Sequence, residues 1–297
     1  MSRSAPQHVP VMLDEIVQWL EPRSEAVVVD GTLGAGGHTR ALAAAVGPAG
    51  MVIAFDRDPQ ALAAAESNLA GLPVKLVAAN YSELLEVLEQ LRIAAVDAIV
   101  LDLGLSSDQL ADDERGFSFD ALGPLDLRFD PTTGRPASEL VNRLDPEELA
   151  NLLYTHGEER LSRRIARKIV ERRRVQPITQ ARELAEIVRG CYPRMRGHDR
   201  IDPATRTFQA LRIAVNDELG SLDRALATFP KCLRRDGRLA VISFHSLEDR
   251  RVKEAFRDDP HWRALTKKPL RPSDPEIQRN PRARSAKLRV ASRTIFQ

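Results

Sequence analysis

Four short apolar runs separated by helix-like stretches fill the first hundred residues, and this alternation constrains the fold more than any other feature. The runs are AVVVD (26–30), MVIAFD (51–56), VKLVAA (74–79) and DAIVLDLG (97–104). The stretches between them are rich in helix formers, and the one at 59–71 ends at a glycine. Buried strands joined by helices predict βαβ units and a parallel sheet covered on both faces.

The rhythm changes in the middle of the chain, where no strand is predicted between 109 and 206. The predicted helices and strands beyond the fourth run are helices at 145–155, 158–174, 180–191 and 207–229, and strands at 238–245 and 287–296. We therefore predict a first α/β part at 1–108, an inserted helical substrate-recognition domain at 109–206, and a second α/β part at 207–297.

The composition, with 43% hydrophobic and 29% charged residues, is that of a globular protein and excludes a disordered or fibrous chain. No apolar run approaches the roughly 18 residues of a membrane span, and the N-terminus lacks the apolar core of a signal peptide. Cys191 and Cys232 stand in no paired pattern, which suits a reducing compartment. These features predict a cytoplasmic protein without membrane association.

Positive charge is concentrated in two segments, although the whole chain carries a net charge of only +2. Residues 160–174 hold eight basic residues and one acidic residue, hence +7, and residues 260–297 hold ten and two, hence +8. The rest of the chain therefore sums to −13. Such segregation is expected of a protein that binds a polyanion. The alternative is that both segments are solvated faces.

A glycine-rich turn joins the first strand to its helix in VVVDGTLGAGGHT (27–39), and it predicts a nucleotide-type ligand at the helix N-terminus. Asp56, 20 residues after Gly36, ends the second strand, where a carboxylate accepts hydrogen bonds from ribose hydroxyls. The dinucleotide fingerprint needs a glycine near position 39, which is Thr39 here. This favours S-adenosylmethionine over NAD. In the structural alternative, Asp56 only caps the next helix.

Asp102 ends the fourth strand, and ligands of open parallel sheets collect at such carboxyl ends. The stretch Gly104-Leu105-Ser106 lacks the second glycine of a hydrolase nucleophile elbow, since Asp108 stands in its place. The histidines and cysteines show no spacing typical of metal ligands. We therefore expect Asp102 at the junction of cofactor and substrate, and no metal.

Ten sequence blocks, in order along nearly the whole chain, resemble the bacterial RsmH (MraW) family. They are HVPVMLDE (8–15), DGTLGAGGHT (30–39), FDRDPQA (55–61), LDLGLSSDQL (101–110), ERGFSF (114–119), GPLDLR (123–128), YTHGEERLSRRIARKIVE (154–171), ATRTFQALRIAVNDEL (204–219), ISFHSLEDR (242–250) and NPRARSAKLR (280–289). Members of that family methylate the exocyclic N4 amine of a cytidine in the decoding region of 16S rRNA.

The resemblance implies a Rossmann-like, seven-strand class I S-adenosylmethionine-dependent methyltransferase sheet with an inserted helical domain. It also implies the small ribosomal subunit as partner, and leaves open whether the chain forms a homodimer. The cofactor contacts that it implies are Gly36, Gly37, His38, Asp56, Tyr81, Asp102 and Gln109. With RNA as the polyanion, we expect Arg163, Arg167 and Arg174 of the first basic segment to contact it.

One departure from other base-amine methylases bears on the chemistry. Many of them follow the fourth strand with two prolines and an aromatic residue, and none of these follows Asp102. Phe117 and Phe119 are candidates for the aromatic that stacks on the base, and at least one is expected in the core. A cytosine amine is a weak nucleophile and needs a proton acceptor. Asp102 and Asp126 are the candidates, and Asp126 could instead form a turn.

Two other function classes remain open from the residues alone. An NAD-dependent oxidoreductase fits the glycine turn and Asp56 but gives no role to the two basic segments. A non-catalytic RNA-binding protein that uses S-adenosylmethionine only for its structure fits both features.

Overall fold

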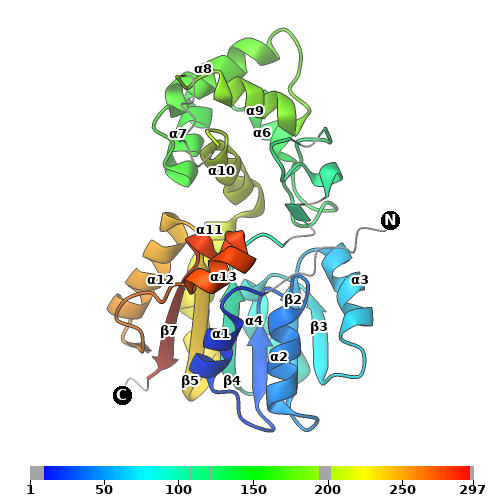
Figure 1. Ribbon diagram of the computed structural model, residues 1–297, viewed down its shortest axis with the longest axis vertical. Coiled ribbons are helices and arrows are strands. Elements are labelled where there is room, and N and C mark those ends of the chain that lie inside the picture. Colours follow the sequence, from blue (N-terminus) through cyan, green and yellow to red (C-terminus); the bar gives the residue numbers. More distant parts are fainter. Residues whose placement is uncertain (1–9, 107–108, 111, 121, 194–201, 295–297) are drawn as a thin grey trace. The chain divides into compact units, whose positions relative to one another are not determined.

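A computed structural model describes residues 10–106, 109–110, 112–120, 122–193 and 202–294. The chain forms two compact units (Figure 1). Unit 1 comprises Met1–Ser106 and Leu219–Gln297, and unit 2 comprises Ser107–Glu218. Within the described residues, no helix is long and apolar enough to cross a membrane.

Unit 1 is built on one sheet of seven strands in the order β3-β2-β1-β4-β5-β7-β6. The strands are β1 (Val27–Asp30), β2 (Met51–Asp56), β3 (Val74–Ala78), β4 (Val96–Asp102), β5 (Leu233–Ser243), β6 (Trp262–Ala264) and β7 (Lys287–Arg293). The first five run parallel, and β7 lies antiparallel between β5 and β6. This confirms the expected seven-strand Rossmann-like class I methyltransferase sheet. The three-residue β6 was not predicted.

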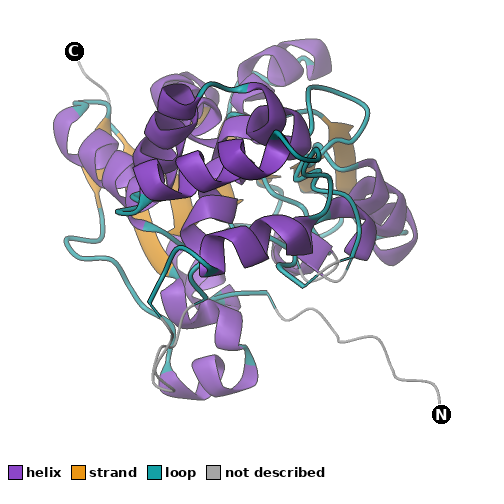
Figure 2. Ribbon diagram, turned by 90° about the horizontal axis from the view of Figure 1, so that it is seen from above, coloured by secondary structure: helices purple, strands orange, loops and turns teal. Residues whose placement is uncertain are grey.

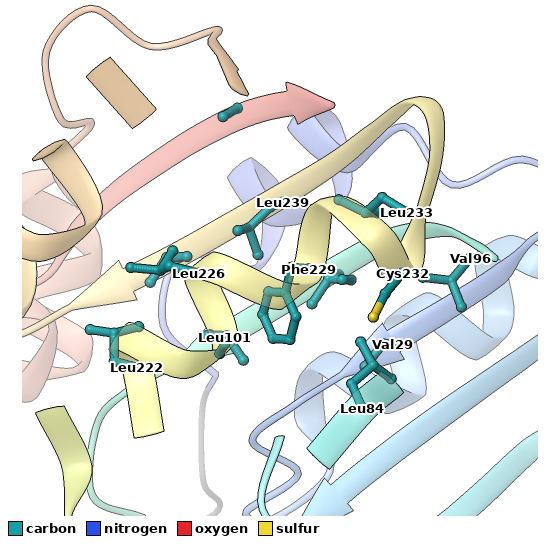
Figure 3. Close-up of a cluster of buried hydrophobic side chains, with 14 of the residues drawn as sticks. Val29, Leu84, Val96, Leu101, Leu222, Leu226, Phe229, Cys232, Leu233 and Leu239 are labelled. Carbon is teal, nitrogen blue, oxygen red and sulfur yellow. The ribbon is translucent and has the colours of Figure 1, made fainter. Parts of the chain in front are cut away.

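Helices cover both faces of this sheet, as Figure 2 shows with strands in orange and helices in purple. They are α1 (Leu13–Leu20), α2 (Gly37–Val46), α3 (Pro59–Asn68), α4 (Leu84–Leu91), α11 (Glu218–Cys232), α12 (Ser246–Asp258) and α13 (Asp274–Arg279), with 3-10 turns η1 (Tyr81–Glu83) and η3 (Pro281–Ser285). Alternate strand residues feed two clusters. Val29 and Leu101 pack with α4, α11 and α12 (Figure 3), whereas Val28 and Val100 pack with α1 and α2.

The strand order reverses between β1 and β4, because the chain runs from β1 outward to β3 and then returns to the other side of β1. The carboxyl ends of strands at such a switch point form the usual ligand crevice of an open parallel sheet. Asp30 and Asp102 end the two strands that flank it. The topology therefore locates the site before any side chain is considered.

Unit 2 is helical, and its described residues contain no strand beyond an isolated bridge between Pro124 and Gln180. Its helices are η2 (Asp113–Arg115), α6 (Ala137–Arg143), α7 (Pro146–Gly157), α8 (Ser162–Arg173), α9 (Ala181–Arg189) and α10 (Thr205–Asn216). Helix α10 packs against α6 and α7, so it belongs to this unit, whereas the predicted boundary at 206/207 divides it.

The prediction of a single helix over 207–229 is wrong, because two helices, α10 and α11, occupy this stretch. Asp217 takes a left-handed conformation with φ of 48°, which ends α10 before α11 begins at Glu218. A short polar side chain such as aspartate is among the few that tolerate this backbone region. Apolar periodicity runs on through the break, which is why the pattern did not reveal it.

Candidate active site

The turn between β1 and α2 is held by the buried carboxylate of Asp30. Its Oδ2 accepts a 2.7 Å hydrogen bond from Thr39 Oγ1, and its Oδ1 accepts one of 3.1 Å from Thr32 N. The hydroxyl of Thr32 in turn accepts a 2.7 Å bond from Asp102 N. Thr39, which stands where dinucleotide-binding proteins place a glycine, therefore anchors this turn, and Thr32 ties the turn to the neighbouring strand β4.

Helix α2 begins at an open N-terminus. Gly36, at the cap position, has a φ of 79°, a conformation that favours glycine, and no side chain caps it among the described residues. A Cβ at Gly37 would lie 2.9 Å from the ring of Pro10, so a larger residue would force the two segments apart. Uncapped amide groups and the helix dipole together favour a carboxylate or phosphate at this point.

Asp56 lies beside the same turn at the end of β2. Its Oδ2 accepts a hydrogen bond of 2.9 Å from Gly34 N, and its Oδ1 accepts one of 2.9 Å from Asp58 N. Burial raises the pKa of the Asp56 carboxyl to about 6, against the lowering effect of these backbone bonds. The cap of helix α3 is Asp58, which accepts from Gln60 N, so the capping alternative for Asp56 does not hold.

Tyr81 opens the short turn η1 that follows β3. Asn80 caps this turn in a capping box with Glu83, and this fixes the backbone that carries the Tyr81 ring. A Cβ at Gly31 would lie 3.0 Å from Tyr81 Cβ, so the tyrosine lies close against the first residue of the β1–α2 turn. The structure therefore brings together Gly36, Gly37, His38, Asp56, Tyr81 and Asp102 at one edge of unit 1.

Asp102 faces His38 across this edge. Its Oδ2 lies 3.9 Å from His38 Nδ1, and its Oδ1 accepts a long hydrogen bond of 3.3 Å from Gly104 N. Burial raises the pKa of the Asp102 carboxyl to about 6; His38 and the Gly104 amide oppose the shift, while Asp30 and Glu248 add to it. The group is thus a carboxylate whose proton affinity has been brought toward neutral pH.

The turn after β5 completes this edge, and the sequence reasoning gave its residues no role. Glu248, only 2% exposed, accepts hydrogen bonds at Oε2 from Phe244 N at 2.8 Å and His245 N at 3.3 Å. His245 caps helix α12 in a reciprocal capping box with Glu248. The spacing of a capping residue and a glutamate three positions later was the available signal.

Three of the predicted residues in unit 2 are Gln109, Asp126 and Phe117. Gln109 is buried there. The carboxylate of Asp126 is held on both oxygens by Arg128, with Nε 2.8 Å from Oδ1 and Nη2 2.7 Å from Oδ2. This paired arrangement supports the turn-forming alternative for Asp126. The third residue, Phe117, is buried and stacks on Phe129 with ring centroids 5.9 Å apart.

The other aromatic candidate is also packed inside unit 2. The ring of Phe119 meets Phe208 edge to face, with centroids 5.0 Å apart and planes at 76°. Both phenylalanines suggested for base stacking thus have aromatic partners within unit 2.

Helix α8 separates its basic residues by role. Arg163, Arg167 and Arg174 are exposed, whereas Arg172 pairs with Glu183 at 2.6 Å and Arg173 donates to Val141 O at 2.7 Å. On the opposite face Ile165 and Ile169 are fully buried. The three predicted arginines are therefore among the residues of this segment that present charge to solvent, together with Arg160, Arg164 and Lys168.

The second basic segment divides in the same way. Lys287 and Arg289 of β7 both pair with Asp249, at 3.0 and 2.7 Å. The lysines and arginines between 267 and 284 are exposed. Some basic residues of this segment therefore form ion pairs within unit 1, and the exposed ones form a basic surface.

Comparisons with known proteins agree with one another over nearly the whole chain. A family described as the MraW methylase family matches residues 5–294. A ribosomal RNA small subunit methyltransferase H from Rhodopirellula baltica is 53% identical, covering 98% of this chain and 93% of its own. Proteins of the same name from Geobacter sulfurreducens and Acidobacterium capsulatum are 48% and 46% identical, covering 96% and 97% of this chain and 98% of their own.

Proposed function

Because the chain belongs to the MraW methylase family, we propose that it methylates the exocyclic N4 amine of a cytidine in the decoding region of 16S rRNA. S-adenosylmethionine is the proposed methyl donor. Relatives that share about half of its residues are named as methyltransferases of small-subunit ribosomal RNA. The observation that carries the proposal is the meeting of an uncapped helix N-terminus, Asp56 and Asp102 at the switch point of the sheet.

The residues present fit an adenosylmethionine molecule. The N-terminus of α2 would hold its carboxylate, and Asp56 would accept hydrogen bonds from the ribose hydroxyls. Tyr81 follows β3 where an aromatic ring would contact the adenine. Gly36, Gly37, His38 and Asp102 would line the rest of the site in this proposal.

The cofactor supplies an activated methyl group on a sulfonium, and the chain must supply position and a proton acceptor. Asp102 is our candidate acceptor for the amine, because its carboxyl lies at the strand end and its pKa is raised to about 6 by burial. A hydrogen bond to this carboxylate would turn the amine toward the donor and stabilise the cation that develops on it. Asp126 is the alternative, although Arg128 already occupies both of its oxygens.

The RNA partner is supported by charge. Arg163 and Arg167 project from a helix whose apolar face is buried, and Arg174 is the C-cap of that helix, so the charge of all three is available to phosphates. We propose that unit 2 recognises the substrate and that the assembled small subunit, rather than free RNA, is methylated.

The test is methyl transfer from labelled adenosylmethionine to small ribosomal subunits that lack the modification, followed by nucleoside analysis of the 16S rRNA. We expect label in N4-methylcytidine at one decoding-region position. Label in another nucleoside would reject the proposed target. Binding of subunits without any transfer would favour a non-catalytic RNA-binding protein, and reduction of a substrate with NADH would favour an oxidoreductase.

A further inference from the structure

The end of β5 places an aromatic ring beside Asp102, and the proposed function has given that ring no role. Asp102 is paired with Ile242 in the register of β4 and β5, and Leu103 N donates to Ile242 O at 3.0 Å. Gly104 and Phe244 therefore each stand two residues beyond a paired position at the same edge of the sheet. This is the edge on which the cofactor residues converge.

Gly104 shows how close the ring comes. A Cβ at this position would lie 2.7 Å from Cε2 and 3.0 Å from Cζ of Phe244, and 3.3 Å from Oδ1 of Asp102. Cε2 of the ring and Oδ1 of the carboxylate are consequently no more than about 6 Å apart, the sum of the first and last separations. Glycine at position 104 thus leaves the space that the ring occupies beside the proposed amine acceptor.

The backbone that carries this ring is fixed by a buried charge. Glu248 accepts from the amides of Phe244 and His245, and it is almost fully removed from solvent. Burying a carboxylate is costly unless hydrogen bonds satisfy it. Here those bonds hold the backbone of the first two residues after β5, so the backbone that carries the Phe244 ring is fixed in position. Phe244 packs against the cluster that contains Val28 and Val100 but is only partly buried, so part of this residue is open to a ligand.

We propose that Phe244 positions the substrate by packing its ring against the target pyrimidine while the amine of that base faces Asp102. The inference rests on the proposed function and names the aromatic that the sequence left unassigned. Every base offers an apolar π face, and rings at centroid separations of about 4.5–7 Å attract one another in stacked or edge-to-face arrangements. Phe117 and Phe119 already have such partners in Phe129 and Phe208.

Two substitutions at position 244 separate stacking from packing. Phe244→Leu keeps an apolar side chain without a π face, and Phe244→Tyr keeps the ring. With small subunits as substrate and saturating adenosylmethionine, we expect kcat/KM to fall about tenfold to a hundredfold in the leucine variant and to stay near wild type in the tyrosine variant. The Kd of adenosylmethionine, measured by calorimetry, should change less than about twofold in both.

Phe256→Leu is the matched control, since Phe256 is a buried ring of the same unit that packs on Trp262 with centroids 5.5 Å apart. It should lower the melting temperature and leave kcat/KM unchanged. If Phe244→Leu itself loosens the fold, Phe244→Met, with a longer apolar side chain, takes its place. Wild-type rates in Phe244→Leu, or equal losses in the leucine and tyrosine variants, would overturn the inference. A wild-type enzyme that methylates no cytidine would instead reject the proposed function.

Discussion

His38 Nδ1 and Asp102 Oδ2 face each other at 3.9 Å, while the other nitrogen of the imidazole, Nε2, lies 2.9 Å from the carbonyl oxygen of Val11. A carbonyl only accepts hydrogen bonds, so Nε2 carries a hydrogen. In a neutral imidazole, Nδ1 would then direct a lone pair at the carboxylate. A proton on the Asp102 carboxyl removes this repulsion.

The ionisation of Asp102 should therefore cost stability. Its folded-state pKa of about 6 exceeds the ordinary 3.8, so the folded chain binds more protons than the unfolded chain between these values. Stability due to this group is present at acidic pH and falls as the pH rises through about 6. We expect Asp102→Asn to be more stable than wild type at pH 8 by on the order of 2 kcal/mol, with the difference shrinking toward pH 4.5. Denaturant unfolding across this range measures it.

Asp202→Asn provides the opposite case. Burial alone would raise the pKa of Asp202, but hydrogen bonds from Arg189 lower it below its usual value. The ionised Asp202 carboxylate stabilises the fold at pH values above its ordinary pKa, and this stabilisation is lost only as the pH falls below that pKa. The variant should be destabilised by a nearly constant amount from pH 5 to pH 8. If the stability difference between Asp102→Asn and wild type stayed constant with pH, burial of the Asp102 carboxylate would not be lowering the stability of the fold.

The same variant tests the chemistry. If Asp102 accepts a hydrogen bond from the cytosine amine, Asp102→Asn keeps the size and loses the charge that stabilises the developing cation. Single-turnover rates at saturating adenosylmethionine should fall roughly a hundredfold or more, which is the effect of losing one acid–base group. Near wild-type rates, together with weaker cofactor binding, would instead mean that Asp102 mainly holds the cofactor. Asp126 or a backbone carbonyl would then be the better acceptor.

Asp56→Ala should weaken adenosylmethionine binding. Removing the carboxylate would also remove two hydrogen bonds to the ribose, and charged hydrogen bonds contribute about 1.5–3 kcal/mol. Calorimetric titration should show a Kd raised at least roughly tenfold to a hundredfold, which is the effect of losing one such bond, as each 1.4 kcal/mol is a factor of ten. Asp58→Ala is the control, because Asp58 caps α3 and should affect stability without affecting the Kd. Unchanged affinity in the folded Asp56 variant would remove this residue from the site.

Sequence patterns predicted those elements of the fold whose residues are buried in the core. Val28, Val29, Val100 and Leu101 alternate between two covered faces, so their strands read as continuous apolar runs. The edge strand β6 was missed because three residues, two of them exposed, carry no such pattern. The end of α10 was missed because it depends on the backbone conformation of Asp217 alone.

The same distinction applies to the residues of the candidate site. Sequence patterns predicted that Asp56 and Asp102 lie at one edge of the sheet, because the carboxyl ends of parallel strands meet there whatever their side chains. Phe244 and Glu248 were overlooked, although they follow β5 at the same edge, because their importance depends on distances across strands. Position along the sheet was predictable, whereas the contact of the Phe244 ring with Gly104 was not.

The exposed arginines of α8 provide the last prediction. Replacing Arg163, Arg167 and Arg174 with glutamine should weaken binding to small subunits and flatten its salt dependence. Each phosphate that the protein no longer neutralises reduces the slope of log K against log salt by roughly 0.7–0.9, so the slope should change by about 2–3 if all three arginines bind phosphates. The fold should not suffer, because these side chains are exposed within a segment of net charge +7 and removing them relieves repulsion.

The matched control removes three arginines from elsewhere in unit 2. Arg135 and Arg143 are exposed and pair with Glu139, and Arg182 is exposed on α9. Glutamine at these three positions changes the net charge of the chain by the same amount. If both triple variants shift the salt slope equally, the effect is one of total charge and α8 is an ordinary solvated face. If only the α8 variant shifts it, while both bind adenosylmethionine as wild type does, the helix contacts RNA phosphates directly.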